Sequence, residues 1–164
     1  MNGIFLIIGG NLGNRIQCIN QGREAIHQQI GRIVQSSSIY ETAAWGQTDA
    51  PPYLNQVLQV DSCLSPQKLL ETALNIESSA GRTRLKKWDS RTLDIDILLF
   101  DHLIIEQPGL KIPHPRMQTR RFVLTPLAEI APHLVHPVLG KDIATLLQEC
   151  EDPLQVQYFT DSLE

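Results

Sequence analysis

The sequence predicts an α+β domain of the ferredoxin-like class, in which a βαββαβ order of elements gives an antiparallel sheet with both helices packed on one face. Short apolar, β-prone runs alternate with two longer segments whose apolar residues recur at helical spacing. Glycine, proline and asparagine mark the ends of these segments. With 164 residues and 42% apolar composition, the chain can bury the core of a single domain spanning 1–164.

The chain opens with a strand and a helix. Residues 4–8 are continuously apolar, as in a buried strand, and the glycine-rich segment 9–13 forms a tight turn after them. Apolar residues at helical spacing then predict a helix over 15–30. Asn14 or Asn11 is its expected N-cap.

Two strands follow this helix. Residues 32–41 are β-prone, and 53–60 form a second apolar strand. Between them, 42–52 contain Gly46, Pro51 and Pro52 and predict a long loop.

The second helix and the last strand of the sheet come next. Ser65 is a suitable cap and Pro66 suits the first helical position, so a helix is predicted to begin there and to run to about Ser79. A basic loop over 81–90 leads to a strand over 92–100, whose apolar end is typical of a central strand covered on both faces. Beyond it, we expect an irregular segment over 101–117 and two extra C-terminal helices, at 125–130 and 142–150.

The most informative motif lies where the basic loop meets this last strand. Side chains of a strand alternate between its faces, so Asp94 and Asp96 share one face while Leu93, Ile95 and Ile97 fill the other. Two neighbouring carboxylates repel each other unless a cation lies between them. Oxygen ligands of this kind suit Mg²⁺, which completes its coordination with phosphates and water.

Positive charge just before the acids supports a polyphosphate site. Five cationic residues lie between Arg82 and Arg91, where they could hold phosphates beside a metal ion. An arbitrary Asp-x-Asp is more often a solvated strand face, and a basic loop is more often solvated too. The apolar run from Ile97 to Phe100 weakens that alternative, because acids at the end of such a strand are costly without a purpose.

Composition limits the classes of function. The net charge of −4 argues against nucleic-acid binding through a generally basic surface. The three cysteines show no C-x-x-C spacing, which argues against a disulfide framework or a zinc site and is typical of a reducing cytosol. The first residues lack the basic region of a signal peptide, and no apolar stretch is long enough to span a membrane. We therefore expect a cytoplasmic protein without nucleic-acid or membrane partners.

Two further groups of residues suggest ligand contacts. His114 is held between two prolines, as suits a group that contacts phosphate or handles a proton, and Arg120 offers a planar fork of donors. Tyr53 and Asn55 share a strand face, where an aromatic ring beside an amide could bind a flat heterocycle. In isolation, an ordinary strand with one exposed asparagine is the simpler interpretation of the second group.

Together these segments resemble the 6-hydroxymethyl-7,8-dihydropterin pyrophosphokinases of folate biosynthesis. The resemblance covers residues 4–132 in the order of the family, and its most specific part is the Arg-Thr-Leu-Asp-Ile-Asp run followed by Pro-His-Pro. The matching pieces are Gly9 to Gly13, Tyr40 to Thr42, Pro52 to Asn55, Arg82 with Trp88, Arg91 to Asp96, Pro113 to Pro115, Arg120, Phe122, and Pro126 with Leu127.

The resemblance implies transfer of pyrophosphate from ATP to the hydroxymethyl group of the pterin, with release of AMP. It implies two Mg²⁺ ions on Asp94 and Asp96, and ATP as co-substrate. Arg82, Arg91, Asp94 and Asp96 are the implied catalytic residues. The implied ATP contacts are Glu77, Arg82, Lys87, Trp88, Arg91, His114 and Arg120. The implied pterin contacts are Thr42, Ala43, Trp45, Tyr53, Asn55 and Phe122.

Two other functions stay open from the residues alone. A Mg²⁺-dependent phosphohydrolase could use the same two acids without any pterin. A nucleic-acid-binding module on a ferredoxin-like sheet is disfavoured, because the chain is acidic and only 5% aromatic. The expected partners are therefore small molecules, and we expect a monomer.

Overall fold

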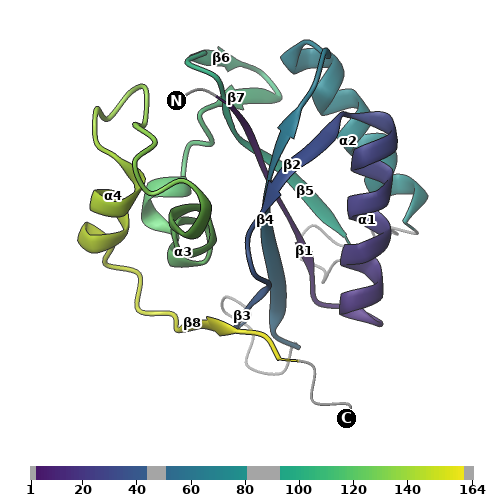
Figure 1. Cartoon of the computed structure of the whole chain (residues 1–164), viewed down its shortest axis with the longest axis horizontal. Coiled ribbons are helices and arrows are strands. Elements are labelled where there is room, and N and C mark those ends of the chain that lie inside the picture. The colour runs from purple at the N-terminus through teal and green to yellow at the C-terminus, as the bar shows by residue number, and fades with distance from the viewer. Residues whose placement is uncertain (1–2, 44–50, 81–92, 161–164) are drawn as a thin grey trace.

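The computed structural model describes residues 3–43, 51–80 and 93–160. Within these ranges one antiparallel sheet has the strand order β5-β1-β4-β3-β8, and β2 pairs with the other half of β4 (Figure 1). The strands are β1 (Ile4–Gly10), β2 (Arg32–Ser36), β3 (Tyr40–Thr42), β4 (Tyr53–Asp61), β5 (Asp94–Phe100) and β8 (Val156–Tyr158). The order along the chain and across the sheet confirms the ferredoxin-like prediction.

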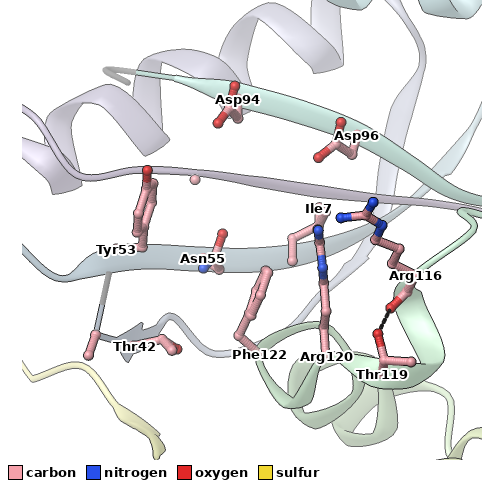
Figure 2. Close-up of a pocket in the computed structure, with 12 residues that line it drawn as sticks. Ile7, Thr42, Tyr53, Asn55, Asp94, Asp96, Arg116, Thr119, Arg120 and Phe122 are labelled. Carbon is pink, nitrogen blue, oxygen red and sulfur yellow. Dashed lines mark hydrogen bonds between the residues drawn. The ribbon is translucent and has the colours of Figure 1, made fainter. Parts of the chain in front are cut away.

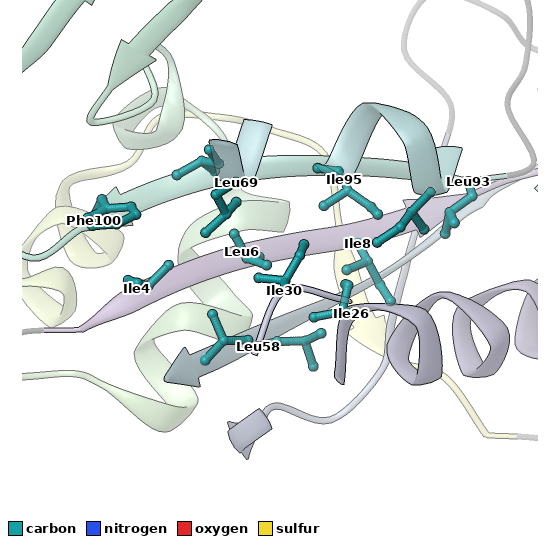
Figure 3. Packing of buried hydrophobic residues seen from close by; sticks show 14 of the residues in the cluster. Ile4, Leu6, Ile8, Ile26, Ile30, Leu58, Leu69, Leu93, Ile95 and Phe100 are labelled. Atoms are coloured by element: carbon teal, nitrogen blue, oxygen red, sulfur yellow. The ribbon is translucent and has the colours of Figure 1, made fainter. Parts of the chain in front are cut away.

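One face of the sheet is covered by α1 (Arg15–Gln29) and α2 (Pro66–Ser79), as expected (Figures 1 and 3). Alternate apolar side chains of β1, β4 and β5 pack there against the apolar stripes of both helices. The helix starts follow the predicted signals. The Asn14 side chain accepts the N–H of Gln17 at 3.1 Å, and the Ser65 hydroxyl accepts the N–H of Lys68 at 3.2 Å.

The opposite face of the sheet is only partly open. Here α3 (Arg121–Ile130) packs on the sheet and α4 (Ile143–Glu149) packs against α3, and together they form a second apolar cluster with the sheet. Phe5, Val57 and Leu98 supply the apolar side chains on the sheet side of this cluster. Because these side chains are grouped at one end of the face, the helices cover that end and leave the other accessible.

Several predicted elements have different bounds. The expected strand 32–41 is divided into β2 and β3. At the break, the Ser37 N–H donates to the Val57 carbonyl, and the Ser37 hydroxyl oxygen accepts the Val57 N–H. The segment 101–117 is not irregular: it contains the hairpin β6 (Ile105–Gln107) and β7 (Leu110–Ile112), followed by a 3₁₀ turn, η1 (Met117–Thr119). The helix expected at 125–130 begins at Arg121, and β8 was not predicted.

β5 is an edge strand in the described sheet, not the central strand that its apolar run suggested. Its register with β1 shifts between Phe5 and Leu6, so Leu98 is the additional residue. As a result Leu98 and Leu99 both pack in the cluster with α3, while Phe100 returns to the opposite cluster. Both faces are therefore covered, which explains the continuous apolar sequence.

None of the helices in the described ranges is long and apolar enough to cross a membrane.

Candidate active site

A cavity of about 520 Å³ lies beyond the end of the sheet face that α3 and α4 cover (Figure 2). Segments far apart in the sequence meet around it. Its walls are formed by Ile7, Gly9, Thr42, Ala43, Tyr53, Asn55, Asp94, Asp96, Arg116, Thr119, Arg120 and Phe122.

The floor of the cavity is built by the alternation of side chains on three neighbouring strands. Gly9 on β1 is the cross-strand partner of Asn55 on β4 and of Asp94 on β5. Ile7, two residues earlier, is the partner of Asp96. Gly9, which has no side chain, thus lies between the Asn55 amide and Asp94. The two halves of the cavity therefore share one continuous floor.

The two acids lie as the sequence predicted. Asp94 and Asp96 both point into the cavity from β5, whereas Leu93, Ile95 and Ile97 are buried in the opposite cluster (Figure 2). Asp96 is exposed and Asp94 is half-buried. Both carboxylates are therefore accessible to a ligand that enters the cavity.

Asp94 and Asp96 suit Mg²⁺ better than they suit a metal ion whose ligands all come from the protein. The described residues contain no group of three or more His, Cys, Asp or Glu side chains that could hold a metal ion. Mg²⁺ commonly uses one or two carboxylates and takes phosphate and water oxygens for its other positions. Asp94 and Asp96 match that donor set.

The other half of the cavity is aromatic and polar. Tyr53 and Asn55 point into it from β4, and Phe122 reaches it from the start of α3 (Figure 2). Thr42 and Ala43 follow from the end of β3. The Thr42 hydroxyl is buried there and has no hydrogen-bond partner among the described residues.

Cationic side chains close the cavity opposite the acids. Arg120 and Arg116 come from the segment around η1, which the hydroxyl of Thr119 stabilises by donating to the Arg116 carbonyl at 2.8 Å. The Arg120 guanidinium lies 5.7 Å from the centre of the Phe122 ring. Burial and the neighbouring Arg116 lower the pKa of Arg120, while Asp96 acts in the opposite direction. Asp96 and Arg120 thus interact electrostatically across the cavity.

His114 lies next to this basic group without lining the cavity itself. Its backbone N–H donates to the Leu98 carbonyl of β5 at 2.9 Å, and its Nδ1 accepts the N–H of Arg116 at 3.2 Å. Burial, together with the charges of Arg120 and Arg116, lowers its pKa to about 4. The imidazole is therefore neutral near pH 7.

Glu77 is also outside the cavity wall. It is buried between α2 and β5, where its Oε2 accepts the backbone N–H of Ile95 at 2.7 Å. Ile95 is the residue between the two acids, so Glu77 holds the strand that presents them.

Of the residues predicted for the site, the structure places Thr42, Ala43, Tyr53, Asn55, Asp94, Asp96, Arg120 and Phe122 around one cavity. Trp45, Arg82, Lys87, Trp88 and Arg91 lie outside the described residues. Sequence reasoning missed the wall positions Ile7, Gly9, Arg116 and Thr119. The alternation that placed the two acids also applies to β1 and could have found Ile7 and Gly9, whereas Thr119 carried no such signal.

Comparison with known proteins identifies the family of the chain. The sequence model of the 7,8-dihydro-6-hydroxymethylpterin-pyrophosphokinase (HPPK) family matches residues 5–132. A Haemophilus influenzae 2-amino-4-hydroxy-6-hydroxymethyldihydropteridine pyrophosphokinase is 41% identical over 134 residues, which cover 81% of this chain and 84% of the relative. A Bacillus subtilis protein of the same name is 43% identical over 132 residues, 79% of each chain.

A solved structure shares the fold. The crystal structure of Plasmodium falciparum HPPK-DHPS superposes with a TM-score of 0.70 at 16% identity over 90% of this chain. The chain spans less than half of that longer protein, 43% of its length. The likeness at this identity supports the architecture, and the match of the family's sequence model supports membership: the chain belongs to the 7,8-dihydro-6-hydroxymethylpterin-pyrophosphokinase family.

Proposed function

We propose that this chain transfers the pyrophosphoryl group of ATP to 6-hydroxymethyl-7,8-dihydropterin and releases AMP, as a step of folate biosynthesis. The observation that carries the proposal is a single cavity in which an acid pair and an aromatic, amide-bearing seat share one floor. In the reaction, the pterin hydroxyl oxygen forms a bond to the β-phosphorus of ATP. The bond from that phosphorus to the oxygen of the α-phosphate breaks, and the hydroxyl proton is released.

The acid half of the cavity is assigned to the phosphates. Asp94 and Asp96 would hold two Mg²⁺ ions, which supply charge neutralisation and alignment when bound. Arg120 contacts the phosphates from the opposite wall, with His114 beside it. We assign Arg82, Arg91, Lys87, Trp88 and Glu77 to ATP, and Arg82 and Arg91 to catalysis, from their match to the family's motifs.

The other half of the cavity is assigned to the pterin. Tyr53 and Phe122 offer aromatic faces to its flat ring. The Asn55 amide provides one donor pair and one acceptor, which suit the mixed edge of the heterocycle, and the buried Thr42 hydroxyl adds an unused partner. Ala43 and Trp45 complete this assignment. A polar heterocycle beside Thr42 would offer a partner to its hydroxyl, which is costly to leave unpaired.

The proposal extends to the domain organisation, the oligomeric state and the cellular location of the chain. We infer that residues 1–164 act as one catalytic domain and that the active species is a monomer of the cytoplasm.

A coupled assay tests the proposal. Incubation with ATP, Mg²⁺ and 6-hydroxymethyl-7,8-dihydropterin should form AMP and the pterin pyrophosphate in equal amounts. Omission of the pterin should stop AMP formation. Release of phosphate or pyrophosphate without pterin would instead favour a phosphohydrolase that uses the same acids.

A further inference from the structure

Arg15, the first residue of α1, contacts three segments that lie far from it in the sequence. Its Nη1 donates to Glu41 Oε2 at 2.7 Å and to the Pro52 carbonyl at 2.9 Å. Its guanidinium carbon lies 5.4 Å from the centre of the Phe159 ring. One side chain thus joins β3, the start of β4 and the C-terminal segment.

The partners of Arg15 stand directly beside the proposed pterin contacts. Glu41 precedes Thr42 on β3, and Pro52 precedes Tyr53 on β4. Thr42 and Tyr53 form the terminal pair of the β3–β4 ladder. Arg15 therefore hydrogen-bonds to Glu41 and Pro52, the two residues that directly precede this pair in the proposed pterin wall.

Within the described residues, the β3 side of this ladder is short. β3 has three residues, and its outer neighbour β8 is equally short. Strand ends with few ladder bonds open most readily. The side chains of Arg15 and Glu41 are each 24% exposed, so water screens this pair less than a fully solvated pair.

A neighbouring contact reinforces the same junction. The buried Asn11 donates from Nδ2 to the Pro51 carbonyl at 3.1 Å. The carbonyls of Pro51 and Pro52 are thus both held by the turn and first residue that lead into α1. The start of β4 cannot move relative to α1 without breaking both bonds.

We propose that Arg15 is a positioning residue for the pterin half of the cavity. By bonding Glu41 and Pro52 with one nitrogen, it fixes the distance between the Thr42 and Tyr53 walls. Arg15 does not itself line the cavity, so its effect is transmitted through the two strand ends. The proposal rests on the assignment of the pterin to this half.

The test compares Arg15→Met, which keeps an unbranched apolar stem but removes the guanidinium with its charge and donors, with the intact chain. Dissociation constants for the pterin and for a non-hydrolysable ATP analogue are measured by calorimetry, and KM and kcat by AMP formation. Arg15→Met should weaken pterin binding about tenfold, within the range of measured couplings between contacting residues. Binding of the ATP analogue should change less than about twofold on the same scale.

Arg32→Met is the matched control. Arg32 pairs with Asp61 at 3.8 Å on the far end of β4, and both side chains are largely exposed. This variant should leave both dissociation constants unchanged. Glu41→Gln should reproduce part of the pterin effect, and the double variant should lose less than the sum of the two.

The outcomes separate this inference from the proposed function. If the intact chain binds no pterin, the proposed function fails first. If the intact chain binds pterin and Arg15→Met binds it equally well, the positioning role is overturned. Equal losses for pterin and ATP analogue would also overturn it, because they would indicate general destabilisation. Should Arg15→Met not fold, Glu41→Gln provides the same comparison.

Discussion

A Cβ atom placed on Gly9 would lie 2.3 Å from the Oδ1 of Asn55 and 2.2 Å from the Leu54 carbonyl oxygen. Both distances are far shorter than any ordinary contact, so β1 and β4 can approach this closely only with glycine at this position. The same glycine pairs with Asp94 on its other side. Gly9 therefore fixes the contact between the proposed pterin seat and the acid pair.

Gly9→Ala should displace the Asn55 amide and weaken pterin binding by about tenfold or more, since overpacking of a close contact costs about 1–3 kcal/mol. Calorimetric titration with the pterin measures the loss. Gly3→Ala is the control, because its Cβ would meet the Gln59 side chain at 2.8 Å and the Phe5 ring at 3.0 Å, neither of which lines the cavity. Unchanged pterin affinity in Gly9→Ala would show that Asn55 does not depend on this approach.

The acid pair gives a second prediction. Asp94→Asn and Asp96→Asn keep the size of each side chain and remove its charge. Each variant should lose Mg²⁺-dependent AMP formation by at least about a hundredfold, because alignment and charge neutralisation provide most of the catalysis in phosphoryl-type transfer. The urea midpoint should change little, since removal of one charge relieves repulsion between the carboxylates but, at Asp96, also removes an attraction to Arg120.

Asp101→Asn serves as the control for the acid variants. Asp101 follows β5 with a positive φ of 51°, a conformation that asparagine also tolerates. Its substitution should leave the AMP-forming rate unchanged. A variant of Asp96 that turns over at the wild-type rate would contradict the metal assignment.

The sequence predicted the structure correctly where a periodic pattern of apolar residues coincides with the burial of one face of an element. Alternation along 93–97 placed Asp94 and Asp96 on one face, and the caps Asn14 and Ser65 begin helices as predicted. Each of these depends on interactions within a few residues, which local patterns encode.

Sequence reasoning failed where the partner is distant. Residues 156–158 form β8 because they pair with β3, and the Tyr158 ring stacks on the Tyr40 ring with 5.0 Å between the ring centres. Arg121 donates to the Asp152 and Cys150 carbonyls, about 30 residues away in the sequence, at 3.1 Å and 2.8 Å. No local pattern reports such long-range contacts, and the same limit hid the edge position of β5.

His114 predicts a pH dependence of stability. Its pKa is lowered to about 4 in the folded chain, against an ordinary value near 6.5 in the unfolded chain. Between these values the unfolded state binds more protons, so the contribution of His114 makes the free energy of unfolding fall as pH drops through this window, and this contribution levels off below about 4. Urea unfolding of His114→Asn should show a flatter slope there. Burial lowers the pKa of His136 too, so part of the slope should remain.

Nucleotide binding should reverse the effect on His114. A triphosphate beside the imidazole favours its charged form, so binding of an ATP analogue near pH 5.5 should take up protons. Calorimetry in buffers of different ionisation enthalpy measures this uptake, which His114→Asn should reduce. Equal uptake by both proteins would mean that His114 lies too far from the bound phosphates to respond.

Glu77 gives the last prediction, because its bond to the Ile95 N–H supports β5 between the two acids. Glu77→Ala leaves that buried N–H without this acceptor, which costs about 1–3 kcal/mol, and should lower the free energy of unfolding by about that amount. Glu77→Gln keeps an acceptor oxygen and should lose less stability. Glu71→Ala removes an exposed acid of the same helix, paired with Lys68 at 3.6 Å, and should change stability by less than about 0.5 kcal/mol.

The two Glu77 variants also separate support of the strand from contact with nucleotide. If Glu77 acts by holding β5, AMP formation should follow stability, so that Glu77→Gln stays close to the intact chain and Glu77→Ala falls well below it. If its charge acts on bound ATP, Glu77→Gln should lose affinity for the ATP analogue at full stability. Titration of both variants with the analogue, beside urea unfolding, distinguishes the two roles, and a Glu77→Ala protein with unchanged unfolding would rule out the first.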